Sequence, residues 1–426
     1  MRVAIIGGGY AGLAAGVALA EQGIPTTLFE AGKQLGGRAR GIAWRGLKLD
    51  NGQHLLLGAY RETLRLMALT GVGTGAAHRQ ALQLAIPGRF ELNTPSLPAP
   101  LHLIAGLLAA RGLGVAERLG ALRFAVAMRL QGFRLDRDES VTTLLARHKQ
   151  DGAIGRLLWE PLCLAALNTP PSRASAQIFL NVLRDSFSHA RSDSDMILPT
   201  VDLTQLFPAS AATYLLAHGG ELLAGTRIHR IEPGKGKFLL SWDKSEAIFS
   251  HVICATAPRH ALPLLAAQPG LGQACELIAA LTYQPIATIY LQYPESIRLP
   301  SAMLGLDGKY GQWVFDRGWT HGTPGLLAAV ISAEGDYQDL LPQQLANEID
   351  AELQQRFKLP PPLWHKTIIE KRATFSCDVG VRRPAQATNL ENFYLAGDYT
   401  AGEYPATIEG AVRSGVKCAK LICETP

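Results

Sequence analysis

The chain begins with a pattern of apolar positions that predicts a strand, a helix and a second strand. Residues 3–6 (VAII) form a short apolar run rich in β-branched side chains, as in a parallel strand buried on both faces. The Ala- and Leu-rich segment 10–22 predicts a helix, and Gly23 stands where a helix C-cap belongs. The apolar run at 26–29 predicts the next strand. We therefore expect a βαβ unit at the N-terminus.

Further along, the apolar pattern separates a helical block from a strand-rich block. Residues 75–205 predict mostly helices, which are divided by prolines. Residues 276–385 contain strand-like runs at 286–292 and 326–332, and a helical pattern follows at 343–357. This order predicts an antiparallel sheet with a helix.

Length and composition favour two domains. A chain of 426 residues, 47 % of them hydrophobic, can bury more than one core. We expect an α/β (α+β) fold in which a Rossmann-like dinucleotide-binding domain is combined with a discontinuous second domain. The first domain is assigned to residues 1–74, 206–275 and 386–426, and the second to residues 75–205 and 276–385.

Charge and cysteine content exclude several classes of protein. The formal charge of +5, from 41 basic and 36 acidic residues, is too small to indicate nucleic-acid binding but is compatible with an anionic membrane surface. The six cysteines form no C-x-x-C pair, so no metal site is expected. The apolar run 3–6 meets glycines at once, so no secretory signal is expected. No stretch of 18 uninterrupted apolar residues predicts a membrane-spanning helix.

Gly7, Gly9 and Gly12 form the pattern G-x-G-x-x-G between the first strand and the helix. The first glycine allows a tight turn, the second lets a pyrophosphate approach the backbone, and the third lets the helix pack on the strand. Tyr10 and Ala11 begin the helix, whose N-terminus would face the phosphates. The alternative is a glycine-rich βαβ unit that binds no ligand.

The residues after the second strand extend this pattern. Glu30 is placed to accept hydrogen bonds from a ribose 2′-hydroxyl, and an acid at this position disfavours NADP. Gly36 and Gly37 offer two small backbone positions, and the guanidinium of Arg38 can neutralise a pyrophosphate. In isolation these three residues would fit an ordinary surface turn.

In combination, these features resemble the flavoprotein superfamily of amine oxidases and carotenoid desaturases. Its members carry the same glycine fingerprint followed by L-G-G-R, which is residues 35–38 here. A third match lies near the C-terminus, where NFYLAGD at 392–398 precedes PATIEGA at 405–411. The resemblance implies an FAD-binding domain of the glutathione-reductase/amine-oxidase type. Cys418 and Cys423 lie too far along the chain to hold the flavin covalently, so non-covalent FAD is expected.

The resemblance also implies roles for single residues. Arg38 would neutralise the pyrophosphate, Asp398 would reach the ribityl chain, and the helix after Thr407 would direct its N–H groups at the isoalloxazine. Ile228, on an expected strand that starts at Thr226, would contact the adenine. The expected cofactor-binding residues are Gly7, Gly9, Tyr10, Ala11, Gly12, Glu30, Gly36, Gly37, Arg38, Gln53, His54, Ile228, Gly397, Asp398, Ala406, Thr407 and Ile408.

The stretch LDNGQHLLLGAY at 49–60 narrows the resemblance to the polyisoprenoid branch of the superfamily. With residues 175–187 and 405–415, it is most similar to the hydroxysqualene dehydroxylases, the squalene-associated FAD enzymes of bacterial hopanoid synthesis. The resemblance implies an oxidoreductase that converts hydroxysqualene, a C30 isoprenoid, to squalene with a hydride from reduced flavin. A carotenoid (phytoene-type) desaturase, or a flavin-free prenyl-binding protein of the same fold, are the alternatives.

His54 is a candidate donor of a hydrogen bond to the departing hydroxyl group. Its expected role, however, is a hydrogen bond to the backbone or the cofactor, so the catalytic acid stays unassigned. The sequence 71–75 (GVGTG) has the wrong spacing for a second dinucleotide site. A separate electron donor, a reductase or a ferredoxin-like protein, is therefore expected.

The segment 101–135 alternates apolar stretches with arginines and allows two interpretations. It is either a helix at a membrane interface, with guanidiniums at the level of the head groups, or a pair of ordinary amphipathic helices on a core. The arginines are Arg111, Arg118, Arg123 and Arg129. We expect a cytoplasmic protein that is peripheral on the inner face of the cytoplasmic membrane.

Overall fold

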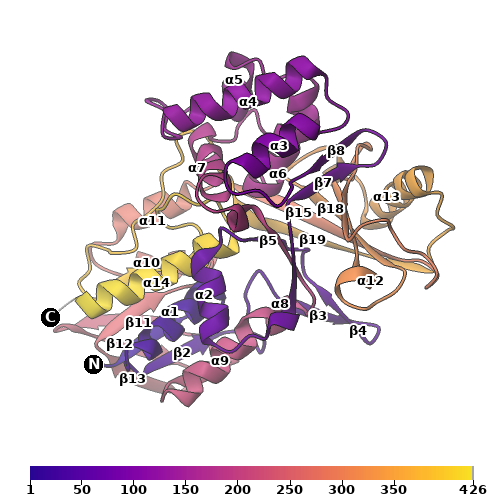
Figure 1. Cartoon of the computed structure of the whole chain (residues 1–426). Coiled ribbons are helices and arrows are strands. Elements are labelled where there is room, and N and C mark those ends of the chain that lie inside the picture. Colours follow the sequence, from indigo (N-terminus) through magenta and orange to yellow (C-terminus); the bar gives the residue numbers. More distant parts are fainter. Residues whose placement is uncertain (425–426) are drawn as a thin grey trace.

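The computed structural model describes residues 1–424 and combines a parallel sheet, an antiparallel sheet and a layer of helices (Figure 1). The N-terminus and the last helix lie together, beside the parallel sheet. Among residues 1–424, no helix is both long and apolar enough to cross a bilayer.

Five parallel strands form the sheet that carries the glycine-rich turn. In sheet order they are β10 (Glu221–Ala224), β2 (Thr26–Glu30), β1 (Val3–Ile6), β14 (His251–Cys254) and β20 (Phe393–Leu395). The strands predicted at 3–6 and 26–29 are confirmed, and β1 is buried along its whole length. Its central position places the turn after β1 at the middle of the sheet edge, where ligands of open parallel sheets bind.

Helices cover this sheet. They are α1 (Tyr10–Glu21), α2 (Arg61–Leu69), α8 (Leu203–Leu206), α9 (Pro208–Ala217), α10 (Pro258–Ala266), α11 (Gly272–Ala279) and α14 (Ile408–Glu424). The predicted end of α1 is confirmed, because Gly23 follows it in the left-handed conformation, with φ +69°. α14 packs directly on α1, since a Cβ atom at Gly415 would come within 2.1 Å of the Ala11 carbonyl oxygen.

A small antiparallel sheet follows β10, and here one expectation is wrong. Its strands are β11 (Arg230–Gly234), β12 (Lys237–Trp242) and β13 (Ser245–Phe249). The strand expected from Thr226 begins only at Arg230, and Ile228 lies in the irregular connection before it. The Thr226 N–H donates to the Glu30 carbonyl at the end of β2, and contact with β12 begins only at His229, whose N–H donates to the Ser241 carbonyl.

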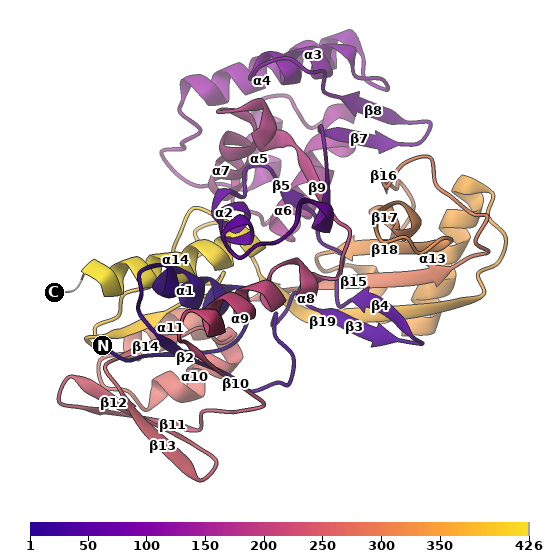
Figure 2. The same ribbon diagram turned by 60° about the horizontal axis from the view of Figure 1, so that its bottom comes forward.

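The second large sheet is antiparallel, as predicted for residues 276–385. Its strands, in order, are β16 (Met303–Gly305), β17 (Trp313–Asp316), β18 (Leu326–Ser332), β15 (Tyr283–Gln292) and β19 (Trp364–Phe375). The helix α13 (Pro342–Phe357) packs on one face, and α12 (Arg317–Thr320) follows β17. A hairpin of β3 (Gly41–Trp44) and β4 (Leu47–Asp50) lies beside β19, with the Lys366 ammonium 4.2 Å from the centre of the Trp44 ring (Figure 2).

The helical layer lies above the second sheet. Its helices are α3 (Leu101–Ala109), α4 (Val115–Leu130), α5 (Val141–Arg147), a π-helical turn (Gly155–Trp159), α6 (Glu160–Leu167) and α7 (Ala176–Phe187). Its short strands are β7 (Gln83–Ile86) with β8 (Phe90–Asn93), and β5 (Leu56–Leu57) and β6 (Ala77–Gln80) on either side of β9 (Met196–Pro199). Single 3₁₀ turns occupy Thr74–Ala76, Arg191–Ser194 and Asp336–Asp339. The mainly helical prediction for 75–205 is confirmed.

Candidate functional site

The glycine-rich turn leaves an open position at the N-terminus of α1. Gly7 has φ +115°, and a Cβ atom at Gly12 would lie 1.9 Å from the Gly7 carbonyl oxygen, so both positions require glycine for the fold. Gly9 differs from them. It is the extended N-cap of α1, and a Cβ atom there would meet nothing nearer than the Gly37 Cα at 3.9 Å. Gly9 therefore borders space at a helix N-terminus, where an anion is favoured.

A second glycine pair faces this turn. The Gly36 N–H donates to the Gly8 carbonyl at 2.9 Å, and Gly9 and Gly36 form a parallel bridge. A Cβ atom at Gly37 would lie 3.2 Å from the Gly9 Cα. The two glycine segments thus form one cradle of backbone.

Glu30 closes one side of the cradle. Its carboxylate accepts hydrogen bonds from the Gly8 N–H and the Gly32 N–H, both at 2.7 Å. Each carboxylate oxygen has a second lone pair, so the same group can still accept from ribose hydroxyls.

Arg38 and Asp398 meet on the other side, although 360 positions separate them. Nη2 of Arg38 donates to the Asp398 carboxylate, and Nη1 donates to the Ala373 carbonyl at 2.9 Å. Burial opposes the charge on Arg38, but the Asp398 carboxylate outweighs it and the pKa of Arg38 is raised. The Arg38 side chain keeps 32 % of its surface exposed, against 7 % for Asp398, so the cation remains accessible from the site.

The start of α14 is held in place by Thr407 and Glu409. Thr407 caps the helix, since its hydroxyl accepts from the Gly410 N–H at 3.1 Å. The fully buried Glu409 accepts from the N–H of Thr63 at 2.9 Å and from its hydroxyl at 2.7 Å, which joins the first turns of α14 and α2. Ala406 and Thr407 are half-buried, so the helix N-terminus borders the site.

The loop after β4 is fixed by contacts from distant segments. Asp50 is buried, and its carboxylate accepts from the Leu203 N–H at 2.8 Å and from Arg317 Nη1 at 3.0 Å. The Tyr290 hydroxyl donates to the Asp50 carbonyl at 3.0 Å. Burial raises the pKa of Asp50, and Arg317 offsets part of that rise.

Gln53 and His54 follow in the same loop and are half-buried. The Gln53 side-chain oxygen accepts from Arg317 at 3.2 Å. His54 Nδ1 lies 3.0 Å from the Gly52 carbonyl oxygen, and because a carbonyl can only accept, Nδ1 carries the proton. Burial lowers the pKa of His54, so the ring is neutral and its Nε2 is an acceptor.

Sequence reasoning missed Arg317 and His321, which the short helix α12 brings to Asp50. Arg317 is completely buried, and His321 Nε2 lies 3.9 Å from an Asp50 carboxylate oxygen. Burial, together with the Arg317 charge, lowers the pKa of His321 to about 3, so this ring is neutral. The only sequence signal was Asp50 itself, because a carboxylate inside an apolar stretch requires a partner.

Most of the predicted site residues gather around this region. Gly9, Gly37, Arg38, Asp398 and the start of α14 border it, from three separate segments of the chain. Ile228, two residues after Thr226, is buried in the apolar cluster that also includes Phe29, and the Thr226 N–H donates to the Glu30 carbonyl.

The sheet face opposite α13 is apolar. Side chains there belong to the same continuous core as residues of α6 and α7. They include Tyr290, Trp313, Phe315 and Val330 on the sheet, and Leu167 and Phe179 on the helices. This side of the site suits a hydrocarbon.

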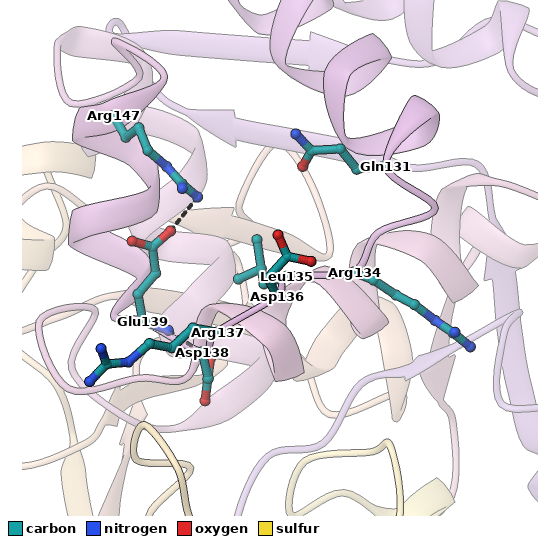
Figure 3. Close-up of a pocket in the computed structure, with 8 residues that line it drawn as sticks. All are labelled: Gln131, Arg134, Leu135, Asp136, Arg137, Asp138, Glu139 and Arg147. Atoms are coloured by element: carbon teal, nitrogen blue, oxygen red, sulfur yellow. Dashed lines mark hydrogen bonds and ion pairs between the residues drawn. The ribbon is translucent and has the colours of Figure 1, made fainter.

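A separate, open pocket of about 760 Å³ lies at the end of α4 and suits no hydrocarbon (Figure 3). Charged side chains dominate its wall, and Arg147 pairs with Glu139 there. The lining residues are Gln131, Arg134, Leu135, Asp136, Arg137, Asp138, Glu139 and Arg147.

Three comparisons place the chain among known proteins. It is 29 % identical to the hydroxysqualene dehydroxylase of Rhodopseudomonas palustris, over 99 % of this chain and 98 % of that protein. It is 24 % identical to the 15-cis-phytoene desaturase of Synechococcus elongatus, over 99 % and 96 % of the two chains. A solved oxidoreductase from Methanosarcina mazei shares the fold, with a TM-score of 0.79 at 14 % identity, covering 99 % of this chain and all of the other.

The family model described as flavin containing amine oxidoreductase matches residues 10–423. This match spans both large sheets and the helical layer, and the structure brings together the glycine cradle, Arg38 and Asp398 that the resemblance named. The chain therefore belongs to the flavin-containing amine oxidoreductase family.

Proposed function

We propose that the protein is an FAD-dependent oxidoreductase that removes the hydroxyl group of hydroxysqualene to give squalene. The observation that carries this proposal is the match to a hydroxysqualene dehydroxylase over almost the full length of both chains. The apolar sheet face beside the site supports a hydrocarbon substrate. The more distant match to a phytoene desaturase makes desaturation the alternative.

The residues of the cradle fit FAD. The space beside Gly9, at a helix N-terminus without a capping side chain, suits the pyrophosphate. Arg38 supplies a cation next to it, Glu30 can accept from the ribose, and Asp398 can accept from ribityl hydroxyls. We assign the remaining predicted contacts to the loop containing Gln53 and His54 and to the start of α14.

When bound, reduced FAD supplies a hydride to the allylic carbon that loses hydroxide, and the departing oxygen leaves as water after taking up a proton. The protein's own contribution is to exclude water and to orient the chain. Phe315 and Val330 belong to an apolar surface that offers an allylic cation no nucleophile. His54 is neutral and its free nitrogen accepts, so it can hold the substrate hydroxyl but is not its proton donor.

The electrons must be replaced after each turnover. The chain carries a single G-x-G-x-x-G sequence at a strand–helix junction, so we assign reduction to a separate electron-transfer protein.

We further propose that α4 rests on an anionic membrane. An exposed apolar stripe runs along this helix at a spacing that places all members on one face. It comprises Val115, Leu119, Val126 and Leu130. Arg123 and Arg129 lie beside the stripe and are exposed, and within residues 1–424 their side chains have no hydrogen bond or ion pair. Apolar side chains flanked by cations suit a lipid interface, where a squalene-like substrate dissolves.

The other two arginines of this segment have roles within the protein. Arg118 donates to the Leu113 and Leu108 carbonyls, both at 3.0 Å, which closes the end of α3. Arg111 pairs with Glu91 at 3.4 Å. The expectation that all four arginines reach head groups is therefore narrowed to Arg123 and Arg129.

An anaerobic assay tests the reaction. Protein with chemically reduced FAD should convert hydroxysqualene to squalene and leave oxidised flavin, as followed by gas chromatography and absorbance. Desaturation is the function if the protein leaves hydroxysqualene unchanged but introduces double bonds into phytoene or squalene with oxidised FAD. Purified protein without bound flavin that is correctly folded would favour the prenyl-binding alternative.

The Gly9→Ala variant is the matched control for the assay, because it should fold like the parent but lose the cofactor. A Cβ atom at this position fits the protein, because its nearest neighbour is 3.9 Å away, but it occupies the space assigned to the pyrophosphate. The variant apoprotein should keep the circular dichroism and melting temperature of the parent apoprotein, but it should fail to bind FAD and make no squalene.

A further inference from the structure

We propose that Arg317 is a positioning residue that orients the Gln53 amide, so that its NH₂ group faces the flavin as a hydrogen-bond donor. This inference rests on the proposed function, because it takes the loop that contains Gln53 as part of the flavin site.

The orientation follows from the chemistry of the two side chains. A guanidinium carries only donors, so the Gln53 atom that lies 3.2 Å from Arg317 Nη1 must be the amide oxygen. The NH₂ group then points the other way. Within residues 1–424 this group has no hydrogen-bond partner, and the Gln53 side chain is half-buried at the site. Two donor hydrogens are therefore available to a ligand.

Arg317 itself is immobile. It is completely buried, Nη1 also donates to Asp50 at 3.0 Å, and Nη2 donates to the Lys48 carbonyl at 3.2 Å. Its guanidinium lies 5.7 Å from the centre of the Tyr290 ring. A rigid cation on α12, in the substrate half of the chain, thus sets the direction of a flexible amide in the loop after β4.

The charges around Gln53 cancel, so the remaining effect of Arg317 is to orient the Gln53 amide. Asp50 balances Arg317, and His321 is neutral. A donor aimed at the isoalloxazine stabilises the negative charge of the reduced ring. The Gln53 amide therefore favours the reduced state, which the proposed reaction requires at its start.

Replacing Gln53 tests the donor. In Gln53→Glu the side chain keeps its shape and its contact with Arg317 but presents an acceptor. We expect a more negative reduction potential of bound FAD, a changed flavin absorbance spectrum, and an FAD dissociation constant raised roughly two- to tenfold, with an unchanged melting temperature of the apoprotein. Gln53→Met should shift the potential in the same direction by a smaller amount.

Replacing Arg317 tests the orientation. Arg317→Lys keeps the positive charge but replaces the planar guanidinium with a single ammonium group, and it should shift the potential part of the way. In the Gln53→Met background, the same lysine substitution should produce no further shift, because an effect transmitted through Gln53 disappears with it.

An unchanged potential and spectrum in Gln53→Glu, or fully additive shifts in the double variant, would overturn the inference. Both readouts require bound FAD but no substrate. If the parent protein binds FAD yet leaves hydroxysqualene unchanged, the proposed reaction is wrong while the Gln53 measurements still decide the inference.

Discussion

Two ion pairs at the site join distant parts of the chain and differ in their access to solvent. In the pair of Arg38 with Asp398, the arginine keeps 32 % of its side-chain surface exposed. In the pair of Arg317 with Asp50, the two side chains are 0 % and 3 % exposed. The first cation can therefore exchange its partner for an incoming phosphate, whereas the second is sealed inside the protein.

The difference in solvent exposure indicates that the two ion pairs have different roles. A pair that water can reach contributes less to stability, because water solvates the exposed partner when the two charges separate. A sealed pair contributes little over an apolar replacement, yet removing one member leaves a buried charge without compensation. We therefore expect ligand binding to depend on Arg38 and the integrity of the fold to depend on Arg317.

The largest expected effect is on stability. Arg317→Met should lower the free energy of unfolding by about 3–5 kcal/mol, because Asp50 is left buried and unpaired. Arg38→Met should lower it by a smaller amount, because water that enters beside the partly exposed Arg38 side chain can solvate Asp398. Urea unfolding of the two apoproteins measures both. Equal losses of unfolding free energy in the two variants would contradict the proposed difference between the two ion pairs.

The second effect is on cofactor affinity. Here replacing Arg38 should have the larger effect. Arg38→Met should cost about 1.5–3 kcal/mol of FAD binding, roughly ten- to hundredfold, since a charge-assisted contact to the pyrophosphate is lost. Fluorescence titration of apoprotein with FAD gives the dissociation constant. Arg45→Met, at the exposed tip of the β3–β4 hairpin, serves as the control and should bind FAD as the parent does.

A third prediction uses pH to test the sealed pair. Folded His321 takes up a proton only near pH 3, whereas the unfolded chain does so near its ordinary pKa of 6.5. Between these values the unfolded state binds more protons, so stability falls as the pH is lowered, by up to about 1.4 kcal/mol per pH unit. His321→Gln should remove this part of the slope between pH 6 and pH 4.

Unfolding free energies of parent and variant, measured across that range, give the slope directly. His78→Gln, on an exposed position of β6, is the matched control and should retain the slope of the parent. A parallel pH dependence in parent and His321→Gln would show that His321 is not held neutral beside Arg317.

The smallest effect concerns Arg123 and Arg129, whose exposed side chains have no partner within residues 1–424. Replacing Arg123 or Arg129 singly by Gln should weaken binding to anionic vesicles by about 1 kcal/mol, roughly fivefold. Arg111→Gln serves as the control because this arginine already pairs with Glu91, and it should bind as the parent does. Sedimentation with phosphatidylglycerol vesicles measures the binding of each variant. Equal losses in all three would show that Arg123 and Arg129 do not differ from Arg111 in membrane binding.

The elements around the glycine-rich turn were predictable because their signals are local. The strand at 3–6, the helix from Tyr10 and the left-handed glycine that ends it, Gly23, depend on neighbouring residues only, and all are found in the structure. The expected strand from Thr226 begins later, because a long-range hydrogen bond holds the Thr226 N–H at Glu30, at the end of β2, and only His229 reaches the partner strand β12.

The pairing of Arg317 with Asp50 could not be predicted from the sequence. The buried position of Asp50 requires a cation, but the chain contains 41 lysines and arginines, and the one that reaches it lies 267 positions away. No motif surrounds Arg317, and its pairing depends on how β17 and α12 meet the loop after β4. The roles of Arg111 and Arg118 were hidden for the same reason, since their partners are backbone and side-chain groups that only folding brings near.

The packing of α14 on α1 has a consequence for the newly made chain. Gly415 packs against Ala11, so the apolar surface of α1 is completed by a segment that is synthesised roughly 400 residues later. At about 5–20 residues per second, α1 waits roughly 20–80 s for its partner. During that interval the first helix exposes an alanine- and leucine-rich surface, and production of the protein should respond to the supply of chaperones that shield nascent chains.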